Sequence, residues 1–182
     1  VSRKFKKEKD IRSAVRYNWT GRYSSFWSGF YHSCEQYFFP ECIRHYFVFT
    51  DQNINIFDKG KVHLLYQKKI GWPFDTLLRF HMFYEYYEEL RHYDYIFFFN
   101  ANILFLENIS NILPVEESYV AVLHPGFFNS VRGEFSYETN PNSLAYIPIY
   151  EGKHYFMGGF NGGKANDYLN LVADLAENIE KD

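Results

Sequence analysis

Cysteine is scarce in this chain: its two residues, Cys34 and Cys42, are too few for a disulfide framework or a four-ligand zinc site. This scarcity favours a reducing compartment. No stretch approaches the run of about 20 apolar residues that a membrane-spanning helix needs, and the N-terminus lacks the apolar segment of a signal peptide. An excess of positive charge is also missing, because 19 basic residues face 22 acidic ones. This balance argues against a general nucleic-acid binder.

Aromatic residues, in contrast, are abundant. The chain has 3 Trp, 17 Tyr and 20 Phe, which make up 22% of its 182 residues and exclude a disordered or linker-like protein. Such a content is typical of an aromatic core and also of platforms that stack on sugars or bases. No internal repeat or low-complexity linker interrupts the sequence, so it predicts one domain at residues 14–182 after a basic leader at residues 1–13.

Dense apolar runs predict the strands of a sheet. Residues 95–99 form the most apolar run and are expected in the centre of the sheet, covered on both faces. Residues 14–19 predict a short, poor strand, because Arg16 and Asn18 interrupt it. Residues 155–160 are expected to pair at an edge. The other predicted strands are residues 45–50, 62–66 and 119–123.

Three helices are expected between and after these strands. The first is capped by Ser24 or Ser25 and has an apolar face that recurs every four residues from Phe26 to Phe38. The other two are expected at residues 75–91, with Asp75 or Thr76 as the cap, and at residues 166–179. Strands that alternate with helices in this way predict a mainly parallel α/β sheet, which binds ligands outside the carboxyl ends of its strands.

Polar residues stand at three of these strand ends. They are Thr20-Gly21 with Tyr23, Asn100-Ala101-Asn102, and His124-Pro125-Gly126. Each is a weak signal alone, because Asn-x-Asn is typical of a turn and a single histidine is more often packed than catalytic. By themselves these residues indicate an α/β domain with a polar cleft.

Seven stretches in order along the chain carry a more specific pattern. They are TGRYSSFWSGFYHSCEQYFF (20–39), HYFVFTDQ (45–52), GWPFDTLLRFHMF (71–83), YDYIFFFNANILF (93–105), HPGFF (124–128), FSYETNPNSLAYIP (135–148) and EGKHYFMGGFNGG (151–163). Together they resemble glycosyltransferase family 6, which contains the histo-blood group A/B transferases and the α-1,3-galactosyltransferases.

The resemblance implies a GT-A type fold, in which a Rossmann-like nucleotide-binding half is merged with an acceptor-binding half. It implies an enzyme that transfers N-acetylgalactosamine or galactose from a UDP-sugar to the 3-hydroxyl of a galactoside, with retention at the anomeric carbon. The partners are then a UDP-sugar donor and an oligosaccharide acceptor, for example a fucosylated galactoside, without nucleic acid or an integral membrane segment. We expect the protein in the bacterial cytoplasm, either free or bound peripherally to the inner membrane.

The resemblance also implies site residues. Those around uridine are Asn18, Trp19, Thr20 and Tyr23. Arg79 falls near the nucleotide, with a solvated helix charge as the alternative. Those that read the C2 substituent of the donor sugar are Met157, Gly158 and Gly159, and those at the acceptor are His124 and Ser136. Because a glycine at position 159 leaves room for an acetamido group, UDP-N-acetylgalactosamine is expected over UDP-galactose.

Asn100, Ala101 and Asn102 stand where the vertebrate members have Asp-x-Asp, which binds a manganese ion on the diphosphate. Neutral amides provide no anionic ligand, and the segment resembles the bacterial branch of the family, so no metal or other cofactor is expected. The two asparagines would donate amide hydrogen bonds to donor oxygens, and fixed cations would meet the charge on departing UDP. Arg79 and Lys153 are the candidates, although Lys153 reads equally well as a surface lysine.

The family's supposed catalytic glutamate belongs to a Trp-His-Asp-Glu segment after the last helix, and this chain ends at Asp182 without that segment. Glu134, Glu138 and Glu151 lie in the right general region, but the resemblance gives none of them this role. We therefore name no catalytic residue. Two hypotheses stay open: a C-terminally shortened transferase, or a non-catalytic relative that binds a UDP-sugar or a glycan.

Overall fold

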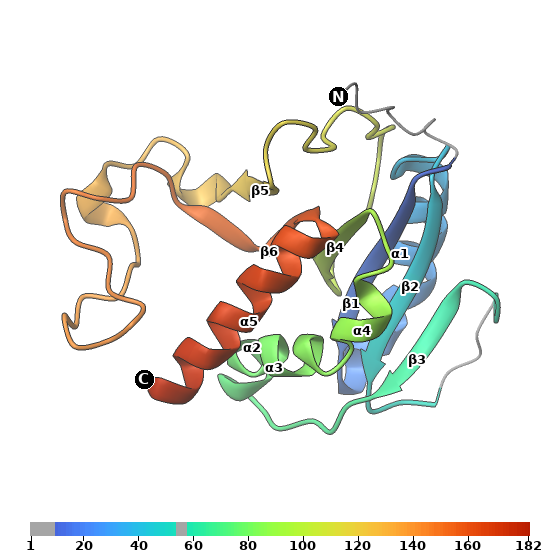
Figure 1. Cartoon of the computed structure of the whole chain (residues 1–182), viewed down its shortest axis with the longest axis horizontal. Coiled ribbons are helices and arrows are strands. Elements are labelled where there is room, and N and C mark those ends of the chain that lie inside the picture. The colour runs from blue at the N-terminus through green and yellow to red at the C-terminus, as the bar shows by residue number, and fades with distance from the viewer. Residues whose placement is uncertain (1–9, 54–57) are drawn as a thin grey trace.

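The computed structural model describes residues 10–53 and 58–182. These residues contain a six-stranded sheet of order β3-β2-β1-β4-β6-β5. The strands are β1 Arg12–Trp19, β2 Ile43–Thr50, β3 Val62–Tyr66, β4 Tyr95–Asn100, β5 Tyr119–Leu123 and β6 Phe156–Lys164. Strands β1 to β4 are parallel to one another, whereas β6 runs antiparallel to both β4 and β5. The expected mainly parallel α/β fold is thus confirmed (Figure 1).

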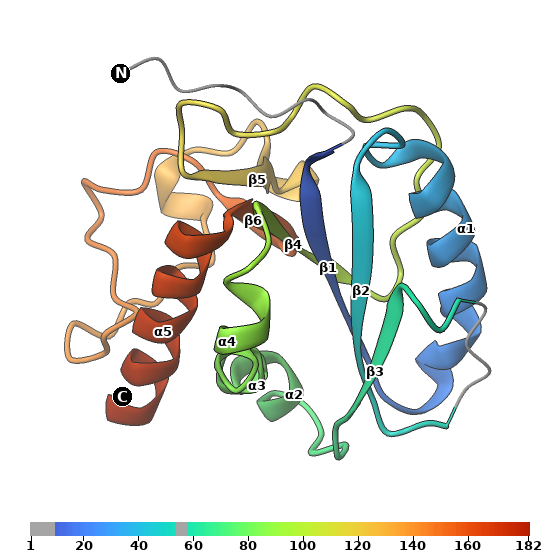
Figure 2. The ribbon, with the colours of Figure 1, turned by 45° about the vertical axis from the view of Figure 1, so that its right-hand side comes forward.

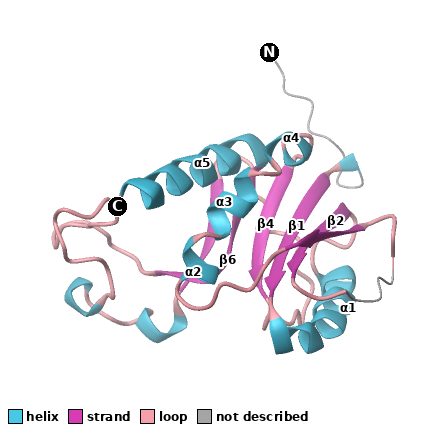
Figure 3. Cartoon of the chain, turned by 90° about the horizontal axis from the view of Figure 1, so that it is seen from below, coloured by secondary structure: helices cyan, strands magenta, loops and turns pink. Residues whose placement is uncertain are grey.

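Helices cover both faces of this sheet. Figures 2 and 3 show α1 on one face and the helices α3, α4 and α5 on the other. The α-helices are α1 Trp27–Tyr37, α2 Phe74–Leu77, α3 Arg79–Tyr84, α4 Tyr87–Leu90 and α5 Ala165–Lys181, and the 3-10 helices are η2 Gly21–Phe26, η3 Pro125–Phe127 and η4 Arg132–Glu134. The last helix expected at residues 166–179 therefore corresponds to α5.

The aromatic residues fill two cores, one on each face of the sheet. Alternate residues of a strand point to opposite faces, so Phe97 and Phe99 pack toward α1 while Ile96 and Phe98 pack toward α3 and α5. All four side chains are at most 2% exposed. The prediction that this run forms a central strand covered on both faces is confirmed.

The first strand is longer than predicted, and it is not a poor strand. Strand β1 begins at Arg12 rather than Ala14, and it lies between β2 and β4 in the middle of the sheet. Arg16 does not interrupt it, because the side chain is fully buried with its guanidinium carbon 3.4 Å from the ring centre of Phe83. The stack on an aromatic face lets a cation occupy a core position.

The single helix expected at residues 75–91 is three short helices. Leu78 and Tyr86 leave helical geometry, with ψ angles of 1° and 25°, and separate α2, α3 and α4. The segment is rich in Phe and Tyr, which favour helices less than Leu or Ala do. Tyr84 of the expected apolar face is half exposed, whereas Leu90 is buried.

Two further expectations need correction. Neither Ser24 nor Ser25 caps α1, because the 3-10 helix η2 precedes it and no side-chain cap is formed. Strand β6 is not an edge strand at residues 155–160 but extends through Gly162 and Gly163 between two neighbours. A Cβ on Gly162 would lie 2.5 Å from the Ile96 carbonyl oxygen, so the absence of a side chain permits this close pairing.

Of the expected basic leader, residues 1–9 lie outside the described residues, and Arg12 and Ser13 belong to β1. At the other side of the molecule, residues 124–155 extend away from the sheet between β5 and β6 (Figure 1). Apart from the short 3-10 helices η3 and η4, this loop-rich segment contains no helix and no strand.

The close pairing of β6 generates a stability prediction. A Cβ on Gly163 would overlap the backbone carbonyl oxygen of Ser118, which cannot turn aside as a flexible side chain can. We expect Gly163→Ala to lower the free energy of unfolding by about 2–4 kcal/mol, measured by urea denaturation. The control is Gly133→Ala, whose Cβ would meet nothing within 4 Å and should change stability by less than about 0.5 kcal/mol. Equal effects of the two substitutions would contradict this account of β6.

Candidate active site

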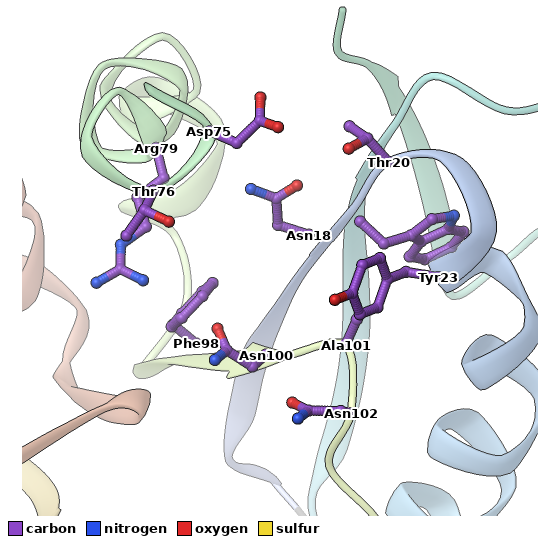
Figure 4. Close-up of a pocket in the computed structure, with 11 residues that line it drawn as sticks. Asn18, Thr20, Tyr23, Asp75, Thr76, Arg79, Phe98, Asn100, Ala101 and Asn102 are labelled. Atoms are coloured by element: carbon purple, nitrogen blue, oxygen red, sulfur yellow. The ribbon is translucent and has the colours of Figure 1, made fainter. Parts of the chain in front are cut away.

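A pocket of about 280 Å³ opens where β1 and β4 end, beneath α2 and α3. Asn18 of β1 and Asn100 of β4 are register partners in the parallel pair, so both polar side chains reach the same end of the sheet. Figure 4 shows them with Arg79 of α3 around one space. The lining residues are Asn18, Trp19, Thr20, Tyr23, Asp75, Thr76, Arg79, Phe98, Asn100, Ala101 and Asn102.

The turn after β1 shapes one wall of the pocket. Gly21 has a φ of 63°, which glycine adopts readily, and its N–H donates to Asp51 Oδ1 at 2.9 Å. This hydrogen bond ties the start of η2 to the end of β2 and places Tyr23, which is 55% exposed, at the rim. An exposed aromatic ring beside a polar pocket can stack on a planar base or a sugar.

The floor of the pocket is fixed from below by a buried tyrosine. The Tyr17 hydroxyl donates to the Ala101 carbonyl oxygen at 2.6 Å and so holds the turn that carries Asn100 and Asn102. Burial raises the pKa of Tyr17 well above its usual range, which keeps the phenol protonated as a donor. The two asparagine amides therefore project from a rigid strand end rather than from a loose loop.

Arg79 supplies positive charge at the pocket. Its guanidinium carbon lies 4.8 Å from the ring centre of Phe98, and Nη1 donates to the Gly158 carbonyl oxygen at a long 3.4 Å. Its Nε is buried without a hydrogen-bond partner among the described residues. Burial lowers the pKa of Arg79 but leaves a guanidinium charged near neutral pH, so its donors are available to an anion.

Gly158 and Gly159 of β6 lie beside this cation and beside Asn100. A Cβ built on Gly159 would approach Asn100 Nδ2 to 3.2 Å and Met157 Cε to 2.7 Å. The structure thus brings the expected residues 157–159 next to the pocket, although they do not line it. A side chain at position 159 would press on the amide of Asn100.

The expected acceptor residues lie elsewhere. His124 Nδ1 accepts from the Gly126 N–H at 3.1 Å and caps η3, and its ring lies 5.1 Å from Phe127. Ser136 is exposed, and its carbonyl oxygen accepts from the Tyr155 hydroxyl at 3.5 Å. Neither residue lines the pocket. Both belong to the segment 124–155, which carries a cluster of aromatic rings of its own.

Lys153 is not at the pocket either. It is exposed and lines a cavity of about 40 Å³ beside Phe127 and Tyr155. Arg79 is therefore the one arginine or lysine among the described lining residues. Two glutamates of segment 124–155 accept hydrogen bonds from neighbouring backbone N–H groups. Glu134 accepts from the Val131 N–H, and Glu138 accepts from the N–H groups of the two residues that follow it.

Three lining residues had no predicted site role: Asp75, Thr76 and Phe98. The sequence suggested Asp75 and Thr76 only as helix caps and Phe98 only as core. In the structure Asp75 Oδ1 accepts from the Ile70 N–H at 2.9 Å, and Pro73 occupies the cap position of α2. The cue for Asp75 and Thr76 was their place in α2, just before Arg79 in the sequence.

The donor set does not suit a divalent cation of the kind that the vertebrate motif binds. The described lining residues include one carboxylate, Asp75, and one of its oxygens already accepts a backbone N–H. Positions 100 and 102 offer neutral amides instead of anionic oxygens. In the described part of the chain, no three His, Cys, Asp or Glu side chains gather in a way that could hold a metal.

A membrane-spanning helix is not found among the described residues, because none of their helices has the length and apolar character that this requires.

Comparison with known proteins decides the family. The sequence model of Glycosyltransferase family 6 matches residues 3–182. The chain belongs to glycosyltransferase family 6. It is 35% identical over 172 residues to the O-antigen biosynthesis glycosyltransferase WbnI of Escherichia coli, a match that covers 90% of this chain and 74% of WbnI.

Animal members of family 6 match a smaller part. Identity to the histo-blood group ABO system transferase 1 of Rattus norvegicus is 35%, over 48% of this chain and 27% of that protein. Identity to the globoside alpha-1,3-N-acetylgalactosaminyltransferase 1 of Gallus gallus is 33%, over 49% of this chain and 28% of that protein. Membership of family 6 implies a nucleotide-sugar donor and a glycan acceptor. The pocket at the ends of β1 and β4 is the candidate donor site.

Arg79 provides the first test of this site. We expect Arg79→Met to weaken UDP binding by roughly 10- to 100-fold, because charge-assisted hydrogen bonds to the diphosphate are lost. The measurement is isothermal titration calorimetry. The control is Arg91→Met, which removes an exposed arginine paired with Glu88 and should leave UDP affinity unchanged. Equal UDP affinity in the Arg79→Met variant and the unmodified chain would refute a donor role for Arg79.

Proposed function

We propose that this protein is a retaining α-1,3-glycosyltransferase that moves N-acetylgalactosamine, or galactose, from a UDP-sugar to the 3-hydroxyl of a galactoside glycan without a metal ion. The single observation that carries the proposal is the convergence of Asn18, Asn100 and Arg79 at the ends of two central parallel strands. Neutral donors and one cation there match a diphosphate that is bound without a metal.

In this proposal the wall after β1 holds the uridine. Trp19, Thr20 and Tyr23 line that side of the pocket, and Asn18 offers both a donor and an acceptor to a base edge or a ribose hydroxyl. The diphosphate is proposed to lie against Arg79, Asn100 and Asn102, which present N–H donors. The pocket thus combines aromatic rings with N–H donors, as a nucleoside diphosphate requires.

Cleavage of the sugar–phosphate bond leaves extra negative charge on the β-phosphate of UDP. Donors that are already aimed at that charge stabilise it without reorganisation, and they act more strongly in a site of low dielectric. Asn100 and Asn102 are held by the Tyr17–Ala101 hydrogen bond, and Arg79 rests on Phe98. We infer that these three residues together take the role of the metal in the vertebrate enzymes.

The sugar is proposed to lie against Gly159. This glycine is buried against the side chains of Asn100 and Met157, and the lack of a side chain of its own is proposed to leave room beside them for the C2 acetamido group. The chicken relative, named for transfer of N-acetylgalactosamine with alpha-1,3 linkage, supports the same donor and linkage. The relative in E. coli, named for O-antigen biosynthesis, supports a bacterial glycan as acceptor and, with it, a location in the bacterial cytoplasm.

The acceptor is proposed to approach from segment 124–155. Its rings of Phe127, Phe135 and Tyr155 lie within 4.6 to 6.1 Å of one another and form an aromatic surface beside His124. Sugar faces pack on such surfaces, while the exposed Ser136 hydroxyl and the imidazole of His124 can hydrogen-bond sugar hydroxyls. A galactoside, for example a fucosylated one, suits this combination.

The proposed function is tested by incubating the chain with UDP-N-acetylgalactosamine and a fucosylated galactoside, with and without EDTA. We expect glycosyl transfer at equal rates in both samples, with an α-1,3 linkage in the product shown by NMR. A loss of transfer with EDTA that added manganese restores would contradict the metal-free mechanism. UDP binding without any transfer would support instead the non-catalytic relative that binds a UDP-sugar.

Donor choice provides a second test. We expect Gly159→Ala to lower kcat/KM for UDP-N-acetylgalactosamine roughly tenfold more than for UDP-galactose, because the added methyl group pushes Met157 and Asn100 toward the space proposed for the acetamido group. The control is Gly133→Ala, whose Cβ would meet nothing within 4 Å and should keep the ratio of the two donors. An unchanged ratio in the Gly159→Ala variant would show that this glycine does not read the C2 substituent.

A further inference from the structure

Arg16 is a charged residue in the hydrophobic core. It lies in the middle of β1, the central strand, and is 0% exposed. None of its three guanidinium nitrogens has a hydrogen-bond partner among the described residues. A buried charge without a partner is costly, so its presence requires an explanation beyond packing.

The surroundings of Arg16 compensate its charge only in part. The guanidinium carbon lies 3.4 Å from the ring centre of Phe83 and 5.6 Å from that of Phe49, which are favourable cation–π distances. Burial lowers the pKa of Arg16, although a guanidinium is basic enough to keep its proton in proteins. Burial also raises the pKa of the neighbouring Tyr168 phenol to about 12, so Tyr168 is neutral near pH 7 and provides no counter-charge. Its hydroxyl donates to Asn161 Oδ1 at 2.5 Å. No carboxylate of the described residues forms an ion pair with Arg16.

This charge lies directly behind the candidate donor site. Residues 16 and 18 of an extended strand point to the same face and are roughly 7 Å apart. Asn18 lines the pocket, and so does Phe98, the register partner of Arg16 in β4. The ring of Phe98 carries the guanidinium of Arg79 on the pocket side at 4.8 Å and contacts Phe83 at 5.5 Å. Arg16 and Arg79 therefore lie at the two ends of one row of aromatic rings, which consists of Phe83 and Phe98.

We propose that Arg16 is a second fixed cation for the donor diphosphate, acting through the core from behind Arg79 without touching the ligand. The inference rests on the proposed function, in which a diphosphate occupies the pocket. Phe83 and Phe98 belong to the apolar core around Arg16, and the low polarity of this core weakens screening, so the field of the charge reaches the ligand. The bound diphosphate in turn supplies the counter-charge that the folded chain lacks.

The test compares Arg16→Met with Arg12→Met, which removes an exposed arginine from the same face of the same strand at its far end. Isothermal titration calorimetry measures the Kd of UDP, and NMR titration measures that of the uncharged nucleoside uridine. We expect Arg16→Met to weaken UDP binding roughly three- to tenfold and to leave uridine binding unchanged, because only the phosphates feel the charge. We expect Arg12→Met to bind both as the unmodified chain does, since an exposed charge is screened.

Stability separates this role from a structural one. Replacement of a buried, unpaired charge by an apolar side chain of similar length should keep or raise the unfolding midpoint, so weaker UDP binding would not reflect a damaged fold. As a second variant, Arg16→Gln keeps a polar side chain without the charge and should weaken UDP binding as Arg16→Met does. Equal UDP affinity in Arg16→Met and the unmodified chain, or an equal loss for uridine, would overturn the inference about Arg16. Failure of the unmodified chain to bind UDP would overturn the proposed function instead.

Discussion

The parallel pairing of β1 with β4 is the constraint on which the rest of the structure depends. Its register sets Asn18 opposite Asn100, and it brings the ends of two central strands to one place beneath α3. The same pairing separates the aromatic residues into two cores, because Phe97 and Phe99 face α1 while Phe98 faces α3. A shift of one residue would turn polar side chains into the core and aromatic ones into the pocket.

Charge is distributed around this pairing in an uneven way. On the α1 face, the buried Arg44 is neutralised by Glu35 at 2.9 Å, and Lys61 binds the same carboxylate. On the α3 face, Arg16 and Arg79 lack such a partner and rest on aromatic rings. The buried arginine on the α1 face therefore has a structural role in a closed ion pair, whereas Arg16 and Arg79 keep positive charge available at the proposed diphosphate site.

Local patterns predicted the strands with dense apolar runs, and they failed where a residue's partner is distant in sequence. Strand β4 was predictable because its aromatic run leaves no polar position before Asn100. Strand β1 was judged poor because of Arg16, since the ring of Phe83 that accepts this cation lies 67 positions further on. Gly162 and Gly163 of β6 likewise have distant partners, because their lack of a side chain lets the backbones of Ile96 and Ser118 approach β6 closely.

The sequence by itself determined the family, the mainly parallel sheet and the polar residues of β1 and β4, because these depend on local composition and ordered motifs. Only the tertiary structure decided that Asp75, Thr76 and Phe98 complete the pocket, since it brings α2 to the ends of β1 and β4. It also decided that Arg16 is a core residue behind the site. Burial and the absence of a counter-charge are properties of the surroundings, and a one-dimensional pattern does not contain them.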